Sequence, residues 1–256
     1  MTWHPVLPAT LTALVLALSA CSPDGGGGTG DGTDTDPPPP VDEPAEPVAF
    51  DHHPPGDLVP GSGSGVTDAF VFVPGMRFPI EEFPSFANSQ VWGAGGMNGP
   101  GGGQCDPVNY ALPWRDNFCE TRGYATPLCP SGTGHQGQDI RPPSCTKSAH
   151  WAVAAEPGTI TAKGSYTVTL TADSGTVYRY LHLDMANLVV DVGSELARGE
   201  RIGLVSNDFG GTTTTIHLHF EIKQNVELSG GGSSVTFVPP YTSLVDAYER
   251  LLAGTP

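Results

Sequence analysis

The residues best suited to chemistry lie in one short stretch, Thr215 to Ile222, with the sequence TIHLHFEI. Side chains on a β-strand alternate between two faces, so an extended conformation divides this stretch cleanly. The even positions from 216 to 222 are all apolar, whereas His217, His219 and Glu221 share the opposite face. Such a strand would present two imidazoles, which bind metals and transfer protons, to one cleft. A surface strand with two solvated histidines is the competing interpretation.

A second group precedes this stretch by about 80 residues, in His135-Gln136-Gly137-Gln138-Asp139. A histidine, a carboxylate and a further histidine make a three-ligand zinc site whose fourth position stays open. Zinc in such a site lowers the pKa of water to about 7 and polarises carbonyl groups. His182, at the end of an apolar segment, is a candidate for moving the protons that this chemistry requires.

The elements that must position these residues are mostly short strands. Segments of alternating or β-branched and aromatic residues, punctuated by glycines, predict strands. These are residues 70–73, 151–155, 166–170, 176–183, 202–205, 216–223 and 235–238. Near the C-terminus, residues 243–252 carry apolar side chains at helical spacing and predict one amphipathic helix. We therefore expect a mainly β, antiparallel fold with long loops and a short C-terminal helix.

Composition supports this class and excludes others. The 34 glycines and 26 prolines among 256 residues favour a loop-rich β protein over a helical bundle. The net charge of −16 argues against binding nucleic acid or an anionic lipid surface through electrostatics.

Five cysteines indicate the compartment. Cys21 stands apart, and Cys105, Cys119, Cys129 and Cys145 form an even set without a C-x-x-C pair. Two disulfides formed outside the cytosol are the better interpretation than a zinc knuckle. Three connectivities are open. We favour Cys105–Cys119 with Cys129–Cys145, because the second bond would enclose His135 and Asp139 in a stiff loop.

The first residues carry an export pattern. An apolar stretch ends in Leu18-Ser19-Ala20-Cys21, which resembles the lipobox of bacterial lipoproteins. This implies a signal peptide over residues 1–20, lipidation of Cys21 and a membrane anchor. Ser22 in place of Asp implies the outer membrane, facing the periplasm. Residues 1–5 lack the Lys or Arg usual in signal peptides, so an ordinary signal with a chance cysteine and a misassigned start both stay open.

Two further segments lie between this signal peptide and the domain that contains the candidate metal ligands. Residues 21–65 are rich in Gly, Pro and Asp and predict a disordered tether. Residues 66–129 predict a loop-rich extension that contains disulfides. The domain with the histidines is expected over residues 130–240, followed by the helix and tail at 241–256.

The ordered motifs of that domain resemble one family. They are His-x-Gly-x-Asp, Tyr-x-His-Leu, a Gly-x-x-Ile-Gly hairpin after Val-Gly, and His-Leu-His-Phe-Glu. In this order they resemble the lysostaphin-type zinc endopeptidases, the LytM domain family, over about residues 130–240. The resemblance implies a compact, barrel-like antiparallel fold of the duplicated hybrid motif type. A loop at 141–150, containing Cys145, departs from the family pattern and lengthens the chain beside the site.

The resemblance also implies the roles of five residues. His135, Asp139 and His219 match the ligands of one zinc ion, and His182 and His217 match the two catalytic histidines. The implied function is zinc-dependent hydrolysis of peptide bonds in peptidoglycan cross-links.

Two other functions stay open. A non-enzymatic LytM-domain lipoprotein would serve as a wall-binding adaptor or amidase activator, although all five positions are filled here. A biotinyl or lipoyl carrier, suggested by Val192-Gly193 through Gly203, lacks the lysine hairpin and leaves the histidines unexplained. The sequence gives neither the cleaved bond nor the oligomeric state.

Overall fold

The computed structural model describes residues 50–228 and 231–256. The predicted signal peptide, Cys21 and most of the predicted tether lie outside the described residues. Within the described residues, none of the helices combines the length and the apolar character needed to cross a membrane.

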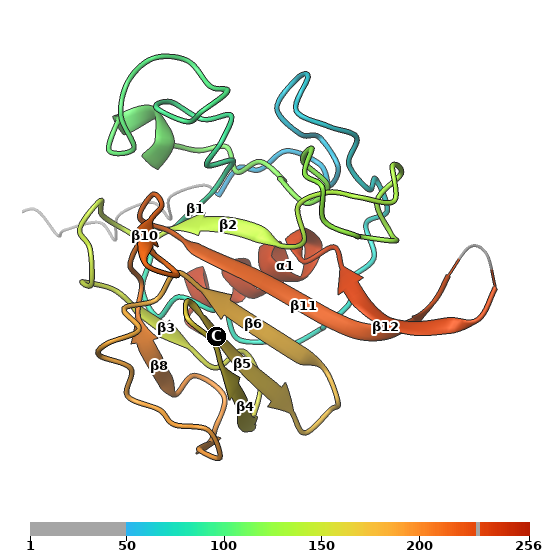
Figure 1. Cartoon of the computed structure of the whole chain (residues 1–256), viewed down its shortest axis with the longest axis vertical. Helices are drawn as coiled ribbons and strands as arrows, with labels where there is room; N and C mark the ends of the chain where they lie inside the picture. The colour runs from blue at the N-terminus through green and yellow to red at the C-terminus, as the bar shows by residue number, and fades with distance from the viewer. Residues whose placement is uncertain (1–49, 229–230) are drawn as a thin grey trace, which may run out of the picture. The chain divides into compact units, whose positions relative to one another are not determined.

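The fold is built on an antiparallel sheet of eight strands in the order β1-β2-β11-β6-β5-β4-β7, with β12 paired to β11 (Figure 1). The bounds are β1 Phe86–Ala87, β2 Gln138–Arg141, β4 Gly158–Lys163, β5 Thr167–Ala172, β6 Val177–Leu181, β7 Glu195–Leu196, β11 Leu218–Glu227 and β12 Ser233–Val238. Two further pairs join β3 Trp151–Val153 to β8 Arg201–Leu204 and β9 Asp208–Phe209 to β10 Thr212–Thr213. A 3-10 turn covers Pro107–Tyr110, and helix α1 covers Tyr241–Leu252.

The two faces of β11 differ as their residues require. Leu218, Phe220 and Ile222 are fully buried in the main core, where residues of α1 also lie. Figure 1 shows α1 behind the sheet, on the side away from the viewer. Burying these side chains stabilises the sheet by about 2 kcal/mol each. The opposite face of β11 is left to His219, Glu221 and Lys223.

The predicted fold class and C-terminal helix are confirmed, and six of the seven predicted strands are present with shifted ends. The prediction of a strand at 70–73 is wrong. There the backbone bonds to side chains of α1 instead of a neighbouring strand: Ser243 Oγ accepts from Val73 N at 3.1 Å, and Thr242 Oγ1 donates to Phe70 O at 2.6 Å. Strands β2 and β4 and the two-residue strands β1, β7, β9 and β10 were not predicted.

Residues 50–65, assigned by sequence to the disordered tether, are part of the folded unit. Trp114 O accepts from His53 N at 2.8 Å, and Asp51 O accepts from Trp114 N at 3.0 Å. Phe50 packs edge-on against the fully buried Trp114 ring. The prediction fails for this part because its few apolar residues contact the core directly, although the local composition is polar.

The structure contains two disulfides, as predicted, but their pairing differs. They are Cys105–Cys145 and Cys119–Cys129. The expected pairing was wrong because the backbone folds back twice. Gln104 O accepts from Arg141 Nη1 at 2.9 Å, which holds the Cys105 segment beside the loop at 141–150. The chain from Cys119 to His135 closes on itself, since His135 O accepts from Cys119 N at 3.0 Å.

Peptide mapping without reduction tests this pairing. Proteolysis of the oxidised full chain should yield one linked peptide pair containing Cys105 and Cys145 and another containing Cys119 and Cys129. Recovery of Cys105 linked to Cys119, or of a free thiol among the four, would contradict the structure.

A buried carboxyl predicts how stability changes with pH. Asp116 accepts from Gly56 N and Phe118 N, both at 2.9 Å, and burial outweighs these bonds and raises its pKa to about 6. Because the folded pKa lies above the unfolded value, the folded state is favoured while Asp116 is protonated. This contribution is complete below about pH 4 and is lost as pH rises through 6.

Chemical denaturation between pH 4 and 7 measures it. Relative to Asp116→Asn, whose side chain does not titrate, the wild type should lose on the order of 3 kcal/mol of unfolding free energy across this range. Parallel pH profiles for the two proteins would contradict the burial of an ionisable Asp116.

Candidate metal centre

Strand register brings the motif residues together. In the pairing of β2 with β11, Asp139 lies directly opposite His219. In the pairing of β11 with β6, His219 lies opposite Leu181, so His182 follows at the next position. His135 precedes β2 and His217 precedes β11 by one residue. Residues separated by about 80 positions in the sequence therefore meet at one end of three adjacent strands.

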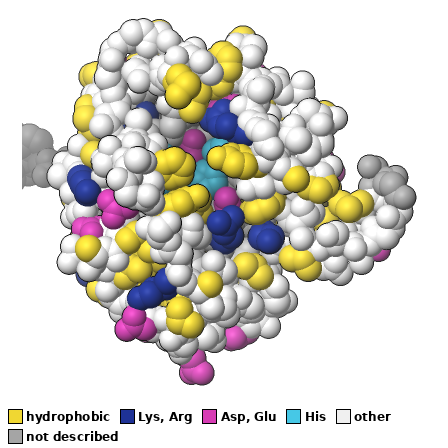
Figure 2. Space-filling model, in the orientation of Figure 1, with side chains coloured by type: hydrophobic (Ala, Val, Ile, Leu, Met, Phe, Trp, Pro, Cys, Tyr) yellow, Lys and Arg dark blue, Asp and Glu magenta, His cyan; other side chains and the backbone are white. Residues whose placement is uncertain are grey.

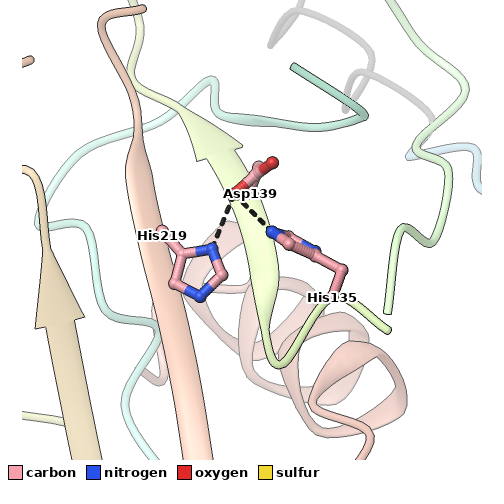
Figure 3. A group of neighbouring side chains, drawn as sticks. All are labelled: His135, Asp139 and His219. Atoms are coloured by element: carbon pink, nitrogen blue, oxygen red, sulfur yellow. Dashed lines mark hydrogen bonds and ion pairs between the residues drawn. The ribbon is translucent and has the colours of Figure 1, made fainter. Parts of the chain in front are cut away.

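His135, Asp139 and His219 form a tight, buried group (Figure 3). Asp139 Oδ1 lies 2.9 Å from His219 Nδ1 and 3.4 Å from His135 Nε2. One donor atom from each residue can be chosen so that all lie within 4.8 Å of one another. Figure 3 shows both rings directed at the carboxylate. The predicted ligand set is thus assembled in space.

Hydrogen bonds leave one nitrogen of each ring free to face this group. His135 Nδ1 lies 3.0 Å from Asn117 O, which can only accept, so Nδ1 carries the proton and Nε2 faces Asp139. His219 Nε2 lies 3.0 Å from Glu221 Oε1, and Glu221 Oε2 pairs in turn with Arg179 Nη1. A carboxylate behind a histidine is a common way to orient a metal ligand.

The pKa shifts of His219 and Asp139 fit a site that binds a cation. Burial disfavours the charged form of His219, but its hydrogen bonds to the Asp139 and Glu221 carboxylates outweigh burial and raise its pKa to about 9. Burial likewise opposes ionisation of Asp139, yet His135 and His217 hold its pKa well below the usual value. The anionic carboxylate at the centre of three imidazoles is therefore charged at neutral pH, as a metal ligand must be.

His182 and His217 border the group on one side. His217 Nε2 lies 3.4 Å from Asp139 Oδ1, and the His182 ring centroid lies 4.7 Å from that of His217. His182 Nδ1 donates to Asp208 O at 2.8 Å. Burial, followed by the neighbouring histidines, lowers the pKa of His182 to about 3, so its ring is neutral with Nε2 unprotonated.

The backbone at His182 is also unusual. Its φ is 67°, in the left-handed region that residues other than glycine seldom adopt. Both backbone groups are nevertheless bonded, since Tyr166 O accepts from His182 N and His182 O accepts from Ser206 N. Such conformations are retained where the surroundings enforce them, often at functional sites.

Sequence reasoning missed Asn117, which holds two of the ligands. Its Nδ2 donates to Asp139 Oδ2 at 2.8 Å, its Oδ1 accepts from Asp139 N at 3.0 Å, and its carbonyl binds His135. The side chain is fully buried. Asn117 lies in the irregular extension with no periodic pattern around it, and its only sequence signal is its place two residues before Cys119.

The structure explains the glycine of His-x-Gly-x-Asp. A Cβ at Gly137 would lie 2.4 Å from Phe220 O and 2.9 Å from His219 Nε2. A side chain therefore cannot fit without moving β11 or the His219 ring. Gly137 is needed for a close approach, and its φ is not in the left-handed region.

Two nitrogen donors and one carboxylate, held by further hydrogen bonds and buried, suit zinc in a three-ligand site with an open fourth position. In Figure 2 the histidine surface lies in a hollow, with Lys and Arg side chains close by. The site is thus open to solvent or substrate on this face, although the individual side chains are largely covered.

The close approach at Gly137 predicts the effect of a methyl group. Gly137→Ala should displace the His219 ring and weaken zinc binding by about 10- to 100-fold, as loss of ligand orientation does. The measurement is competitive zinc titration of the purified full chain with a chelator. Gly123→Ala, at a glycine with no atom within 4 Å of a built Cβ and with no left-handed φ, controls for a general glycine effect. Unchanged zinc affinity in Gly137→Ala would contradict the role of this contact.

The chain is similar to a peptidase family model and to solved structures of peptidases. The model of peptidase family M23 matches residues 133–230. A comparison with curated protein sequences gives no match. Among solved structures, a candidate glycyl-glycine endopeptidase LytM of Ruminococcus gnavus is 22% identical, with 69% of this chain and 61% of that chain covered and a TM-score of 0.45. The alignment therefore spans less than two thirds of that protein.

Two further structures are similar over about half of this chain. The catalytic domain of lysostaphin from Staphylococcus simulans is 24% identical, covers 50% of this chain and 93% of its own, and gives a TM-score of 0.36. A zinc-containing peptidase of Vibrio cholerae is 22% identical over 47% of this chain and 38% of its own, with a TM-score of 0.28. The segment matched by the model of peptidase family M23 contains His135, Asp139, His182, His217 and His219.

Proposed function

We propose that this protein is a zinc-dependent endopeptidase that hydrolyses peptide bonds in the peptide part of peptidoglycan. The observation that carries the proposal is the convergence of His135, Asp139 and His219 on one point, with His182 and His217 beside them. The match of residues 133–230 to the model of a peptidase family supports the reaction type. The substrate class rests on the resemblance of the ordered motifs to the lysostaphin type.

In this proposal the three ligands hold one zinc ion through His135 Nε2, Asp139 Oδ1 and His219 Nδ1. The ion would supply a water of lowered pKa and a Lewis acid for the scissile carbonyl. Asn117, Glu221 and Arg179 keep the ligands oriented.

The two remaining histidines handle protons and developing charge. His182 Nδ1 donates to Asp208 O, which leaves Nε2 free to accept a proton during attack and to return it to the leaving amine. His217 Nδ1 faces Thr215 O at 2.9 Å and therefore carries a proton, which leaves Nε2 directed at the centre. When protonated at Nε2, His217 would donate to the oxygen that gains negative charge.

The adaptor function predicts the same fold but no turnover. Its support is limited to the existence of such relatives in the resembling family, and no contact in the structure favours it over the endopeptidase.

Replacing the two histidines separates these functions. His182→Ala and His217→Ala should each lower product release on the order of 100-fold or more, because acid–base and electrostatic contributions are each of this size. Zinc content should stay at one per chain. The assay is muropeptide analysis after digestion of both glycine-bridged and directly cross-linked walls.

His150→Ala is the matched control, since this histidine bonds to Ser144 Oγ and Glu82 Oε2 outside the site. It should leave product release unchanged. Equal release by all variants would remove His182 and His217 from the mechanism, and no release by the zinc-loaded wild type from either wall would favour the adaptor.

A further inference from the structure

Beyond His219, the same face of the sheet carries a group of charged side chains. Glu221 and Lys223 continue along β11 with the same orientation as His219, because side chains alternate along a strand. Arg179 of β6 lies opposite Glu221, and Phe237 of β12 lies opposite Lys223. Cross-strand partners share a face. These four residues, here called the β11 ridge, therefore form a continuous surface with the candidate metal centre.

The ridge has a surplus of positive charge. Glu221 is its one carboxylate, its side chain is only 3% exposed, and both of its oxygens are engaged, by His219 and by Arg179. Arg179 uses only Nη1 in this pair and is 29% exposed. Lys223 forms no ion pair with any residue that the structure describes. Two cations thus face one carboxylate that is already satisfied.

This surplus is unusual for the chain, which carries 11 Lys and Arg against 27 Asp and Glu. Figure 2 shows Lys and Arg side chains beside the histidine surface, in the same hollow. The Phe237 ring centroid lies 5.0 Å from Lys223 Nζ and 6.0 Å from Arg179 Cζ, so both cations contact the same ring. Their remaining N–H groups can bind an anion.

The spacing fits an extended peptide. A strand rises about 3.4 Å per residue, so Lys223 lies roughly 14 Å along β11 from His219, and the position of Arg179 lies about half as far. A peptide whose scissile bond lay at the metal centre would place a residue two to four positions away over the ridge. The chemical partner that two clustered N–H donors recognise there is a carboxylate.

We infer that Lys223 and Arg179 form a subsite for a carboxylate of the substrate, two to four residues from the cleaved bond. This inference rests on the proposed function, since it assigns a substrate class to that site. It predicts preference for peptides that carry a free carboxylate at this distance over glycine bridges and over carboxamide forms of the same peptide.

The test compares a cross-linked stem peptide with free carboxylates and the same peptide with those groups converted to carboxamides. Dissociation constants are measured by calorimetry on the zinc-loaded full chain carrying His182→Ala, which slows turnover during the measurement. The carboxylate peptide should bind about tenfold more tightly, the range expected for a partly exposed charge-assisted contact. Cleavage of both peptides by the protein with His182 intact is measured in parallel.

Lys223→Gln should abolish most of this preference without changing affinity for the carboxamide peptide, and Lys223→Arg should retain it. Lys163→Gln, which removes the same charge from β4 beside Asp191, is the matched control and should retain the preference. The subsite is refuted if the parent protein shows no preference or if Lys223→Gln keeps it. A binding preference that depends on Lys223, without cleavage of either peptide, would uphold the subsite and refute the peptidase. If both peptides bind equally and are cleaved equally, the peptidase is upheld and the subsite is refuted.

Discussion

The register between β2 and β11 is the constraint on which the site depends. It places Asp139 opposite His219, and the same three-residue ladder places Ile140 opposite Leu218 in the core. A slip of one residue would turn His219 inward and bury it among apolar side chains while exposing Leu218 or Phe220. The hydrophobic face of β11 therefore fixes the position of the metal centre, and Gly137 allows the close approach that this register requires.

The part of the chain outside the family match completes this arrangement. Residues 50–130 are largely irregular, yet Asn117 from this extension holds both His135 and Asp139. Gln104 reaches the start of β11, where its Oε1 accepts from Ile216 N at 2.7 Å. The disulfides Cys105–Cys145 and Cys119–Cys129 fix the two loops that carry these contacts. The extension thus supports the site without supplying a motif of its own.

The faces of β11 and the five site residues could be predicted because the alternation of apolar and polar residues in a strand follows which side chains are buried. Alternation in β11 identified its two faces, and ordered motifs identified the five residues that the structure brings together. Strand β2 was missed because all four of its residues are buried, including Asp139 and Arg141, so no alternation marks it. Cysteine pairing and the role of Asn117 depend on long-range contacts of irregular loops, which leave no periodic signal in the sequence.

Anomalous diffraction at the zinc edge can show whether one zinc ion binds to His135, Asp139 and His219. In crystals of the zinc-loaded protein, we expect a single strong peak about 2.0–2.2 Å from His135 Nε2, Asp139 Oδ1 and His219 Nδ1. His182 and His217 should lie outside coordination distance. A peak held by His182 or His217 in place of one of these ligands, or a peak away from this group, would refute this ligand set.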